Sequence, residues 1–424
     1  MSAVIDTSSV THVLVGFASS LLPELDRLLP PRSVLILEEP EVARVRRAAD
    51  RCRPVAAIAG LIEAPTQDEE HPEAVLDLVA RPRQVRAVVP AVDYGVVCAS
   101  ALATAWGLPG TGARAARALR DKVELRLLAD DARIAQPRWQ EVNGEEDVEA
   151  FRESMGGACV IKPNDRQGSL GVILVDRADD THRAWESSTI VAEPRLRASR
   201  SSPRRYLVEE RLQGPEVSVE ALAAAGKIIF FNVTAKRVAP GSHPVEIGHV
   251  VPGELPDGIV AGLRSSMMAL IAATGFGTGV LHGEWILVDG SQPTLVECAA
   301  RLPGDSIDTL IDLAWGGRLV DDYLGLLEGR AVPGRGPAAR AACIRFFVAG
   351  PGRVASIVGV DSARASTGVV DVEMAVKPGD EVRALASSTD RVGHVIAVGP
   401  DAATAERLAE YAAAQISISI EPAQ

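Results

Sequence analysis

The sequence predicts an α/β protein with α+β parts, divided into about three domains. Its 424 residues exceed the size at which one hydrophobic core stops growing, and roughly 150 residues per domain gives three. The first hundred residues alternate short apolar runs with helical patterns, and a second series of strand-like runs begins after residue 338. The hydrophobic content of 47% is enough to bury several cores.

The first domain is predicted to span residues 1–107. Strand-like runs such as THVLVGF and SVLILEE alternate with helical stretches such as LLPELDRLLP and EVARVRRAAD, and the later runs are VAAIAG and VRAVVP. This alternation predicts a small parallel sheet covered by helices. Gly16 follows the first strand without the other glycines of a dinucleotide fingerprint, so no cofactor is predicted there.

The remaining chain is predicted to form two further domains. The pattern changes near Gly107, and residues 108–330 are taken as one domain with subdomains of about 108–205 and 206–330. After RAVPGRGPA the runs ACIRFFVAG, VASIVGV, VVDVEMAV and HVIAVGP precede the amphipathic AATAERLAEYAAAQI. This order predicts a separate α+β domain over residues 331–424, with mainly antiparallel strands.

Charge and cysteine usage narrow the classes of function. The 44 basic and 56 acidic residues give a net charge of −12, which argues against nucleic acid as a partner and leaves any nucleotide to a local basic site and metal ions. The five cysteines lack the spacing of a zinc or redox motif, so we expect buried, reduced thiols. No signal-like N-terminus or membrane-length apolar run is present, which predicts a soluble, cytoplasmic protein.

Two segments have the composition of loops. Residues 192–205 carry five arginines, and we interpret them as a solvated surface loop. Residues 235–258 are rich in Pro, Gly and His and are long for a simple connection, which predicts a lid or binding loop.

The stretch VIKPNDRQGSLGVILV, residues 160–175, has the pattern of a phosphate-binding hairpin. A strand delivers Lys162, a glycine-rich turn follows, and a second strand leaves after Gly171. Glycines let backbone N–H groups approach phosphate oxygens, and the lysine adds a positive charge. An ordinary hairpin turn that binds nothing is the alternative.

The stretch YLVEERLQGPEVSVEAL, residues 206–222, runs an apolar strand into two glutamates and a Gly-Pro turn. Such a hinge exposes backbone groups that pair with an adenine edge, while a carboxylate accepts hydrogen bonds from an amino group or from ribose. The alternative is a hairpin whose charged residues face water.

The stretch LHGEWILVDGSQPTLVECAARLPGD, residues 281–305, predicts a hairpin with Glu284 and Glu297 at corresponding inward positions. Two carboxylates facing one cavity suit Mg²⁺, which neutralises phosphate charge during phosphoryl transfer. Arg301 follows on the same side and can reach the transferred group. His282 has no second histidine or cysteine at zinc-ligand spacing, which argues against zinc.

The order of these elements resembles the ATP-grasp superfamily: a lysine in RDKVELR, a second in VIKP, the Gly-Ser turn, the EERLQGPE hinge and two metal-binding glutamates. The resemblance implies an ATP-grasp fold over 108–330, preceded by a Rossmann-like domain and followed by an L-amino acid ligase-like domain. It implies ATP and Mg²⁺ as cofactors, with Mn²⁺ as an alternative ion.

The resemblance also implies a role for each matching residue. Those implied roles are Lys122 and Lys162 for the ATP phosphates, with Arg301 stabilising the acyl phosphate; Gln167, Gly168, Ser169 and Gly171 for the phosphate-covering loop; Glu209, Glu210 and Leu212 for the adenine edge; Glu216 for the ribose; and Glu284 and Glu297 for the metal.

One position departs from the common ATP-grasp pattern. Many members carry an Asn two residues after the second metal glutamate, and this chain has Ala299 in ECAAR. The variant is similar to that of the L-amino acid ligases, and IRFFVAGPGRVASIVGVD resembles the domain found with them. This resemblance implies a ligase that activates a carboxylate as an acyl phosphate and joins it to an amine, forming an amide or dipeptide with release of ADP and phosphate.

A substrate pocket is expected between Arg301 and the 235–258 segment. Lys236, Glu246 and His249 match a family pattern there, and Gly304 and Asp305 follow Arg301 in RLPGD. Either Asp305 or Glu246 is expected to receive a substrate amino group; the alternative for Asp305 is to cap the helix that follows. The expected partners are small carboxylates and amines, and a homodimer is the default assembly.

Two other functions stay open at this point. One is an ATP-grasp carboxylase of the biotin carboxylase or purine-pathway type, although no biotinylated-lysine motif is present. The other is a non-catalytic ATP-binding protein, for which Ala299 is the main support.

Overall fold

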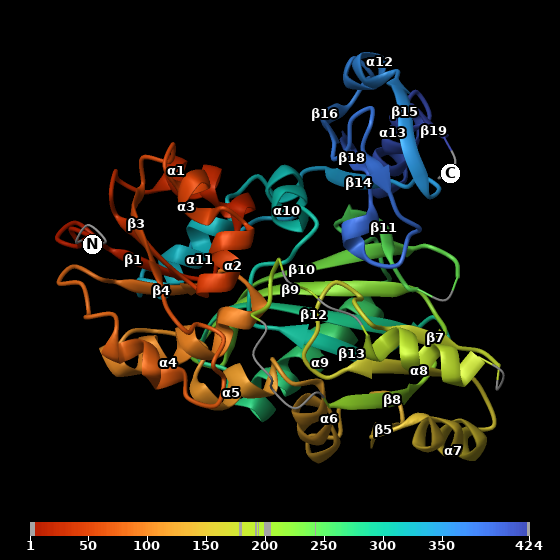
Figure 1. The fold of residues 1–424 in the computed structure, drawn as a ribbon, viewed down its shortest axis with the longest axis horizontal. Helices are drawn as coiled ribbons and strands as arrows, with labels where there is room; N and C mark the ends of the chain where they lie inside the picture. Colours follow the sequence, from red (N-terminus) through yellow and green to blue (C-terminus); the bar gives the residue numbers. More distant parts are fainter. Residues whose placement is uncertain are drawn as a thin grey trace.

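The computed structural model describes residues 5–177, 180–190, 193, 195–198, 205–241 and 243–421. Figure 1 shows the N-terminal region beside a large central sheet, with the C-terminal region above one end of that sheet. Mixed helices and sheets over these residues confirm the predicted α/β class with α+β parts.

The N-terminal region is built on a parallel sheet in the order β3-β2-β1-β4. β1, β2 and β4 are buried along their whole length, which explains their unbroken apolar sequences. The predicted parallel sheet is therefore confirmed. Its strands are β1 (His12–Val15), β2 (Val34–Glu38), β3 (Ile58–Glu63) and β4 (Ala87–Pro90), and its helices are η1 (Ser19–Leu21), α1 (Leu22–Leu28), α2 (Pro40–Val45), α3 (Ala48–Cys52), η2 (Pro72–Asp77), η3 (Asp93–Gly95) and α4 (Val96–Trp106).

Two helices, α5 (Ala113–Ala118) and α6 (Lys122–Asp131), lead into a second, antiparallel sheet in the order β5-β8-β6-β7. Asp121 caps α6 by accepting from the backbone N–H groups of residues 123 and 124, which fixes the first turn and its Lys122. The elements of this region are β5 (Trp139–Val142), α7 (Glu145–Met155), β6 (Cys159–Pro163), β7 (Ile173–Val175), α8 (Thr181–Thr189) and β8 (Tyr206–Glu210). Residues of α7 and α8 share one apolar core with this sheet.

The largest sheet runs in the order β13-β12-β9-β10-β11-β14-β18-β16, with antiparallel pairing throughout. Its strands are β9 (Glu216–Ala224), β10 (Lys227–Val238), β11 (Glu246–Val251), β12 (Thr278–Val288), β13 (Gln292–Ala299), β14 (Ala341–Phe347), β16 (Val369–Met374) and β18 (Gly393–Gly399). α9 (Asp257–Thr274) packs its buried residues against β9, β12 and β13. α10 (Ile307–Trp315) and α11 (Leu319–Leu327) join this sheet to the N-terminal core.

The C-terminal region shares its largest sheet with the preceding region. β14 pairs with β11 through Gly248 and Arg345, so backbone hydrogen bonds cross the expected boundary near residue 330. A small sheet in the order β17-β15-β19 completes the region. Its remaining elements are β15 (Gly352–Val358), α12 (Val360–Arg364), β17 (Glu381–Val382), η5 (Ser388–Asp390), α13 (Ala402–Ala413) and β19 (Ser417–Glu421). The boundaries at 107, 205 and 330 stay predictions.

The predicted long loop over 235–258 is wrong. Lys236 lies in β10 and pairs with His249 of β11, so most of the segment is a strand pair. Pro240 and Gly241 lie in the short connection between the two strands, and Pro252 and Gly253 follow β11.

The arginine-rich segment is only partly described, because 191, 192, 194 and 199–204 lie outside the described residues. Within the described part, Arg197 forms an ion pair with Asp165 and its side chain is 15% exposed. The interpretation as a solvated loop is therefore wrong for Arg197, because an acidic partner holds its charge against the protein.

The five cysteines are all buried and free of disulfides, as expected. Among the helices that the structure describes, none combines the length and apolar character needed to cross a membrane.

Candidate nucleotide and substrate site

A cavity of about 1700 Å³ opens between the central sheet and the elements around it. Small-molecule sites are commonly about 300–1,000 Å³, so this volume has room for more than one small ligand. Its walls come from the β6–β7 turn, the hinge after β8, the β10–β13 strands, the N-terminal region and the C-terminal region. All the sequence-predicted site residues line this cavity.

Lys162 on β6 is buried in an ion network. Its Nζ lies 2.6 Å from Glu209 Oε2, and Arg126 Nη2 lies 2.7 Å from Oε1 of the same carboxylate. Burial alone would raise the pKa of Glu209, but the charges of Arg126 and Lys162 hold it below its usual range. Arg126 also donates to the backbone carbonyls of Leu295 and Val296, which ties the network to β13.

This network gives Glu209 partners that the sequence did not predict. Both of its carboxylate oxygens are engaged and its side chain is only 2% exposed, so it holds Lys162 in place. Its expected place at the adenine edge stays a prediction. Sequence reasoning missed Arg126, and nothing local in RDKVELR distinguishes it from a surface arginine of an amphipathic helix.

In the hinge after β8, Leu212 lines the cavity, and its expected place at the adenine edge stays a prediction. Glu210 also lines the cavity, and its carboxylate pairs with Arg138 at 3.1 Å. Its expected place at the adenine edge also stays a prediction. Glu216 begins β9, and burial raises its pKa to about 7 although Lys236 opposes this rise. It keeps a cavity-facing carboxyl group for the ribose role expected of it.

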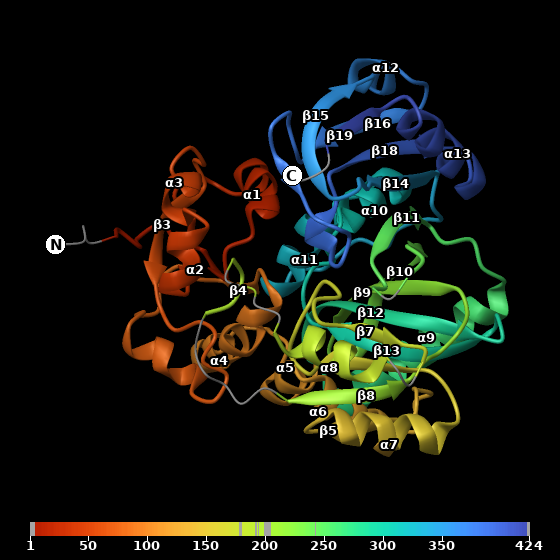
Figure 2. The same cartoon turned by 45° about the vertical axis from the view of Figure 1, so that its right-hand side comes forward.

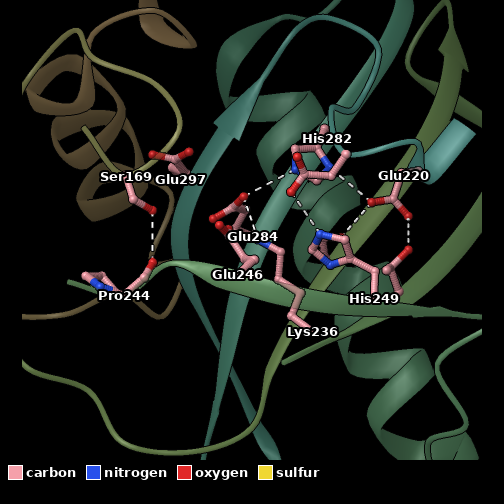
Figure 3. Close-up of polar contacts among 12 residues, drawn as sticks. Ser169, Glu220, Lys236, Pro244, Glu246, His249, His282, Glu284 and Glu297 are labelled. Carbon is pink, nitrogen blue, oxygen red and sulfur yellow. Dashed lines mark hydrogen bonds and ion pairs between the residues drawn. The ribbon is translucent and has the colours of Figure 1, made fainter. Parts of the chain in front are cut away.

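The glycine-rich turn between β6 and β7 lines the cavity. Gly168, Ser169 and Gly171 have positive φ of 63°, 58° and 76°. A Cβ at Gly171 would lie 2.8 Å from Pro163 Cγ, so the turn requires glycine there. Ser169 Oγ donates to the carbonyl of Pro244 at 3.0 Å, as Figure 3 shows, which joins the turn to the β10–β11 connection. Gln167 also lines the cavity.

Glu284 and Glu297 face each other across the β12–β13 ladder, which confirms the predicted register. Each carboxylate has a lysine beside it: Lys236 Nζ lies 2.6 Å from Glu284, and Lys122 Nζ lies 3.1 Å from Glu297. Two facing carboxylates beside a phosphate-sized cavity fit a hard divalent cation such as Mg²⁺. Lys122 also donates to the carbonyl of Arg166 at 2.7 Å, which holds it at the glycine-rich turn.

His282 contacts Glu284, one member of the glutamate pair. It bridges Glu220 at 3.0 Å and Glu284 at 3.3 Å, as Figure 3 shows. Burial would lower its pKa, but the two carboxylates outweigh burial and raise the pKa to about 9. His282 pairs with Ala299 across the ladder, so the small alanine stands beside the imidazole where many ATP-grasp proteins have an Asn.

Arg301 is held by the N-terminal region. Its Nη2 lies 3.0 Å from Asp93 Oδ2, and its Nη1 donates to the carbonyl of Leu302 at 2.8 Å. Asp93 lies in η3, shortly after β4 ends, at the carboxyl edge of the parallel sheet. Sequence reasoning missed Asp93, although that edge is where α/β sheets place polar functional residues.

The substrate end of the cavity is organised around Asp305. Its carboxylate accepts from Arg391 Nη1 at 2.8 Å and contacts His249 Nε2 at 3.0 Å. α10 begins at Ile307, and Asp305 provides no side-chain cap, so the helix-capping alternative is wrong. Burial would raise the pKa of Asp305, but hydrogen bonds from Arg391 and His249 hold it well below its usual range.

The other expected substrate residues lie close to Asp305. Lys236 Nζ contacts Glu246 at 3.1 Å and also contacts Glu284 (Figure 3). This buried lysine therefore links the substrate end of the cavity to the Glu284–Glu297 pair. Gly304 lines the cavity. Sequence reasoning missed Arg391, which comes from the C-terminal region.

Two models of known protein families match parts of this chain. Residues 155–309 match a family model for an ATP-grasp domain, and residues 345–421 match one for L-amino acid ligase C-terminal domain 2. Residues 155–309 of this chain therefore form an ATP-grasp domain. A solved L-amino acid ligase from Bacillus licheniformis has the same ATP-grasp fold, with a TM-score of 0.81 and 17% identity over 98% of this chain and 99% of that one.

The curated relatives match this chain over only part of their own length. The uncharacterized protein y4rH of Sinorhizobium fredii is 26% identical over 318 residues, which are 75% of this chain and 64% of the relative. Alanine–anticapsin ligase of Bacillus subtilis is 25% identical over 251 residues, 52% of each chain. The chain thus spans less than two thirds of the length of these relatives.

Proposed function

We propose that this ATP-grasp protein is an ATP-dependent carboxylate–amine ligase whose substrates are amino acids. The observation that carries the proposal is the convergence, on one cavity, of Lys122, Lys162, the Glu284–Glu297 pair and Arg301. Phosphoryl transfer needs little covalent chemistry from a protein and depends on positioning and neutralising charge. These groups supply both requirements.

In the proposed reaction, a carboxylate oxygen attacks the γ-phosphorus of ATP in line, and the bond to the β,γ-bridging oxygen breaks to release ADP. The amine nitrogen then attacks the acyl phosphate carbonyl, phosphate leaves, and the amine loses a proton. Lys122 and Lys162 would hold the ATP phosphates under the glycine-rich turn. Arg301, fixed by Asp93, would stabilise charge on the acyl phosphate and on the tetrahedral intermediate.

Glu284 and Glu297 would hold Mg²⁺, or Mn²⁺ in its place. The metal would supply neutralisation of the phosphate oxygens when bound. Lys236 and Lys122 lie beside these carboxylates, so positive charge from the protein is available next to the phosphate oxygens.

Three observations support amino acids as substrates. The C-terminal region matches the domain named for L-amino acid ligases, one relative is named for joining alanine to anticapsin, and the cavity offers charges of both signs at its substrate end. A zwitterionic amino acid is bound by side chains of both charges. The product would be an amide, such as a dipeptide, and we further propose a cytoplasmic location and a homodimer.

The competing proposal is a purine-pathway activity. A formate-dependent phosphoribosylglycinamide formyltransferase of Synechococcus is 28% identical over 199 residues, 43% of this chain and 48% of that one. The match of residues 345–421 to the L-amino acid ligase domain favours amino acids.

The test is mass spectrometry of products from the purified chain with Mg-ATP and pooled L-amino acids, beside reactions with formate or bicarbonate and an amine. New masses equal to two amino acids minus water, with matching ADP and phosphate, are expected. ADP formed only with formate or bicarbonate would support the competing proposal, and ATP binding without ADP in every reaction would indicate a non-catalytic protein.

A further inference from the structure

A segment of the C-terminal region forms part of the cavity wall. The connection between β17 and β18 contains η5, and its cavity-lining residues are Arg383, Ala386, Ser387, Ser388, Thr389 and Asp390. Figure 2 shows the C-terminal region beside β11, at the end of the central sheet that also carries His249. None of the residues expected from the sequence to bind substrate lies beyond residue 305, so this wall has no assigned role.

The wall, defined as residues 386–390, has a fixed shape. The Oδ2 atom of Asp390 accepts from the backbone N–H of Ala386 at 3.2 Å, and from the backbone N–H and the Oγ of Ser387 at 2.9 Å each. Its Oδ1 pairs with Arg383 at 2.7 Å, and the Asp390 side chain is 5% exposed. The wall is therefore organised before any ligand binds, which reduces the entropy cost of binding.

Arg391 attaches this wall to the substrate end of the cavity. It forms a two-pronged contact with the Asp305 carboxylate, donating from Nη1 to Oδ2 at 2.8 Å and from Nη2 to Oδ1. It also donates to the carbonyl of Glu246 at 3.2 Å and to that of Ser388 at 2.8 Å. Its guanidinium carbon lies 3.7 Å from the ring centroid of Phe346, and its side chain is 11% exposed.

A purely structural link between regions would also use a buried arginine, but the partners of Arg391 point to substrate. Asp305 and Glu246 line the cavity, and Asp305 also contacts His249. The hydrogen bonds that we describe for Arg391 reach Asp305 and the carbonyls of residues 246 and 388, and none of these is placed at the phosphates or the adenine. Arg391 should therefore affect binding at the substrate end of the cavity and not at the nucleotide end.

We infer that Arg391 is a positioning residue for the substrate end and that the wall it anchors selects which amino acid side chain enters. This inference rests on the proposed function. The wall presents Ser388, which is half-buried, and Thr389, which is exposed, so it offers hydroxyl groups and open space. Such a surface accommodates small or polar side chains and can be narrowed by a larger residue at position 389.

The kinetic test compares the full chain with Arg391→Gln, Arg391→Lys and Thr389→Trp. Arg364, which is exposed in the same region and pairs with Asp361, provides the matched control Arg364→Gln. Losing charge-assisted bonds should raise KM for an amino acid substrate about 10-fold or more in Arg391→Gln, with KM for ATP within about 2-fold. Arg391→Lys should recover part of this loss, because it keeps the charge without the two-pronged geometry.

Thr389→Trp should lower kcat/KM for large amino acids relative to glycine or alanine by about 10-fold, because an indole fills space at the wall. It removes no buried charge, so it keeps the inference testable if Arg391→Gln fails to fold. Equal changes in KM for ATP and for amino acids, together with an unaltered amino acid preference in Thr389→Trp, would overturn the inference.

Hydrogen–deuterium exchange separates this inference from the proposed function. Pooled amino acids with a non-hydrolysable ATP analogue should protect residues 302–309 and 383–391 in the unaltered chain. In Arg391→Gln that protection should be lost, while protection of residues 160–175 by the nucleotide stays. If the unaltered chain forms no ADP from amino acids, the proposed function fails and this exchange pattern still decides the inference. Protection unchanged by Arg391→Gln would contradict it.

Discussion

The phosphate end and the substrate end of the cavity differ in how the chain assembles them. At the phosphate end, Lys162 and the glycine-rich turn belong to one hairpin, and Glu284 and Glu297 belong to another. At the substrate end, Asp305 meets an arginine 86 residues later, and nearby Arg301 meets an aspartate 208 residues earlier. Local strand register therefore builds the hairpins of the phosphate end, which ion pairs from α6 hold together, whereas contacts between distant regions build the substrate end.

This difference predicts that substitutions at the phosphate end abolish turnover, whereas those at the contacts between regions reduce it in a graded way. Glu297→Gln should have the largest effect, lowering ADP formation by about 1,000-fold or more, because a neutral amide cannot balance a divalent cation or Lys122. The measurement is ADP release under saturating Mg-ATP and amino acids. Glu373→Gln, at an exposed position on β16, is the matched control. A fall of less than about 10-fold would remove Glu297 from the metal site.

Glu209→Gln tests the phosphate end of the cavity through the free energy of unfolding. Removing this charge leaves Arg126 and Lys162 buried without their anion, which should cost about 3–5 kcal/mol of unfolding free energy and raise KM for ATP. Its neighbour Glu210 pairs with the exposed Arg138, so Glu210→Gln should cost less than about 1 kcal/mol. Urea unfolding of both variants measures the contrast. Equal losses would show that the buried network is not what holds Lys162.

Asp93→Asn tests the contact between the N-terminal region and Arg301. An asparagine keeps one acceptor but loses the charge, so Arg301 should be held less firmly and kcat should fall about 10- to 100-fold with KM for ATP little changed. Steady-state kinetics of both substrates separates these quantities. The control is Asp77→Asn, at an exposed position in the same region. A rise in KM for ATP without a fall in kcat would place the effect at the nucleotide instead.

The smallest expected effect lies outside the cavity, in the pH dependence of stability. Burial raises the pKa of Glu38 to about 7, although its carboxyl group accepts from the backbone N–H groups of Phe17 and Glu39. The folded state then holds a proton that the unfolded state releases above its ordinary pKa near 4.5, so this group should lower stability as pH rises from about 4.5 to about 7.

Glu38→Gln should flatten that part of the stability curve relative to the unaltered chain. Urea unfolding at several pH values between about 4.5 and 7 provides the measurement. Parallel curves for the two proteins would show that Glu38 titrates normally in the folded state.

The difference between the phosphate end and the substrate end also explains which features could be predicted from the sequence. The parallel N-terminal sheet and the Glu284–Glu297 register follow from patterns within short spans, where side-chain alternation fixes which residues share a face. Lys122 was expected from the resemblance of RDKVELR to the ATP-grasp pattern, and it is the first residue of α6, which Asp121 caps. These features depend on neighbours in sequence, and they appeared where expected.

Features that depend on distant partners were not predictable. The ion pairs of Glu209 were not predicted because Arg126, which neutralises it, lies 83 residues earlier on a helix whose pattern is unremarkable. The helix-capping alternative for Asp305 was wrong because Arg391 and His249 attract its carboxylate more strongly than a helix terminus does. Residues 235–258 were misread as a loop because their turn residues obscured two paired strands.

The most direct test of the central claim follows oxygen from the carboxylate into phosphate. An amino acid substrate labelled with ¹⁸O in both carboxylate oxygens is incubated with the chain, Mg-ATP and a second amino acid, and the released phosphate is analysed by mass spectrometry. An acyl phosphate intermediate transfers one labelled oxygen to each phosphate, with one amide formed per ADP. Phosphate free of ¹⁸O, formed alongside an amide product, would contradict activation of the carboxylate by phosphoryl transfer.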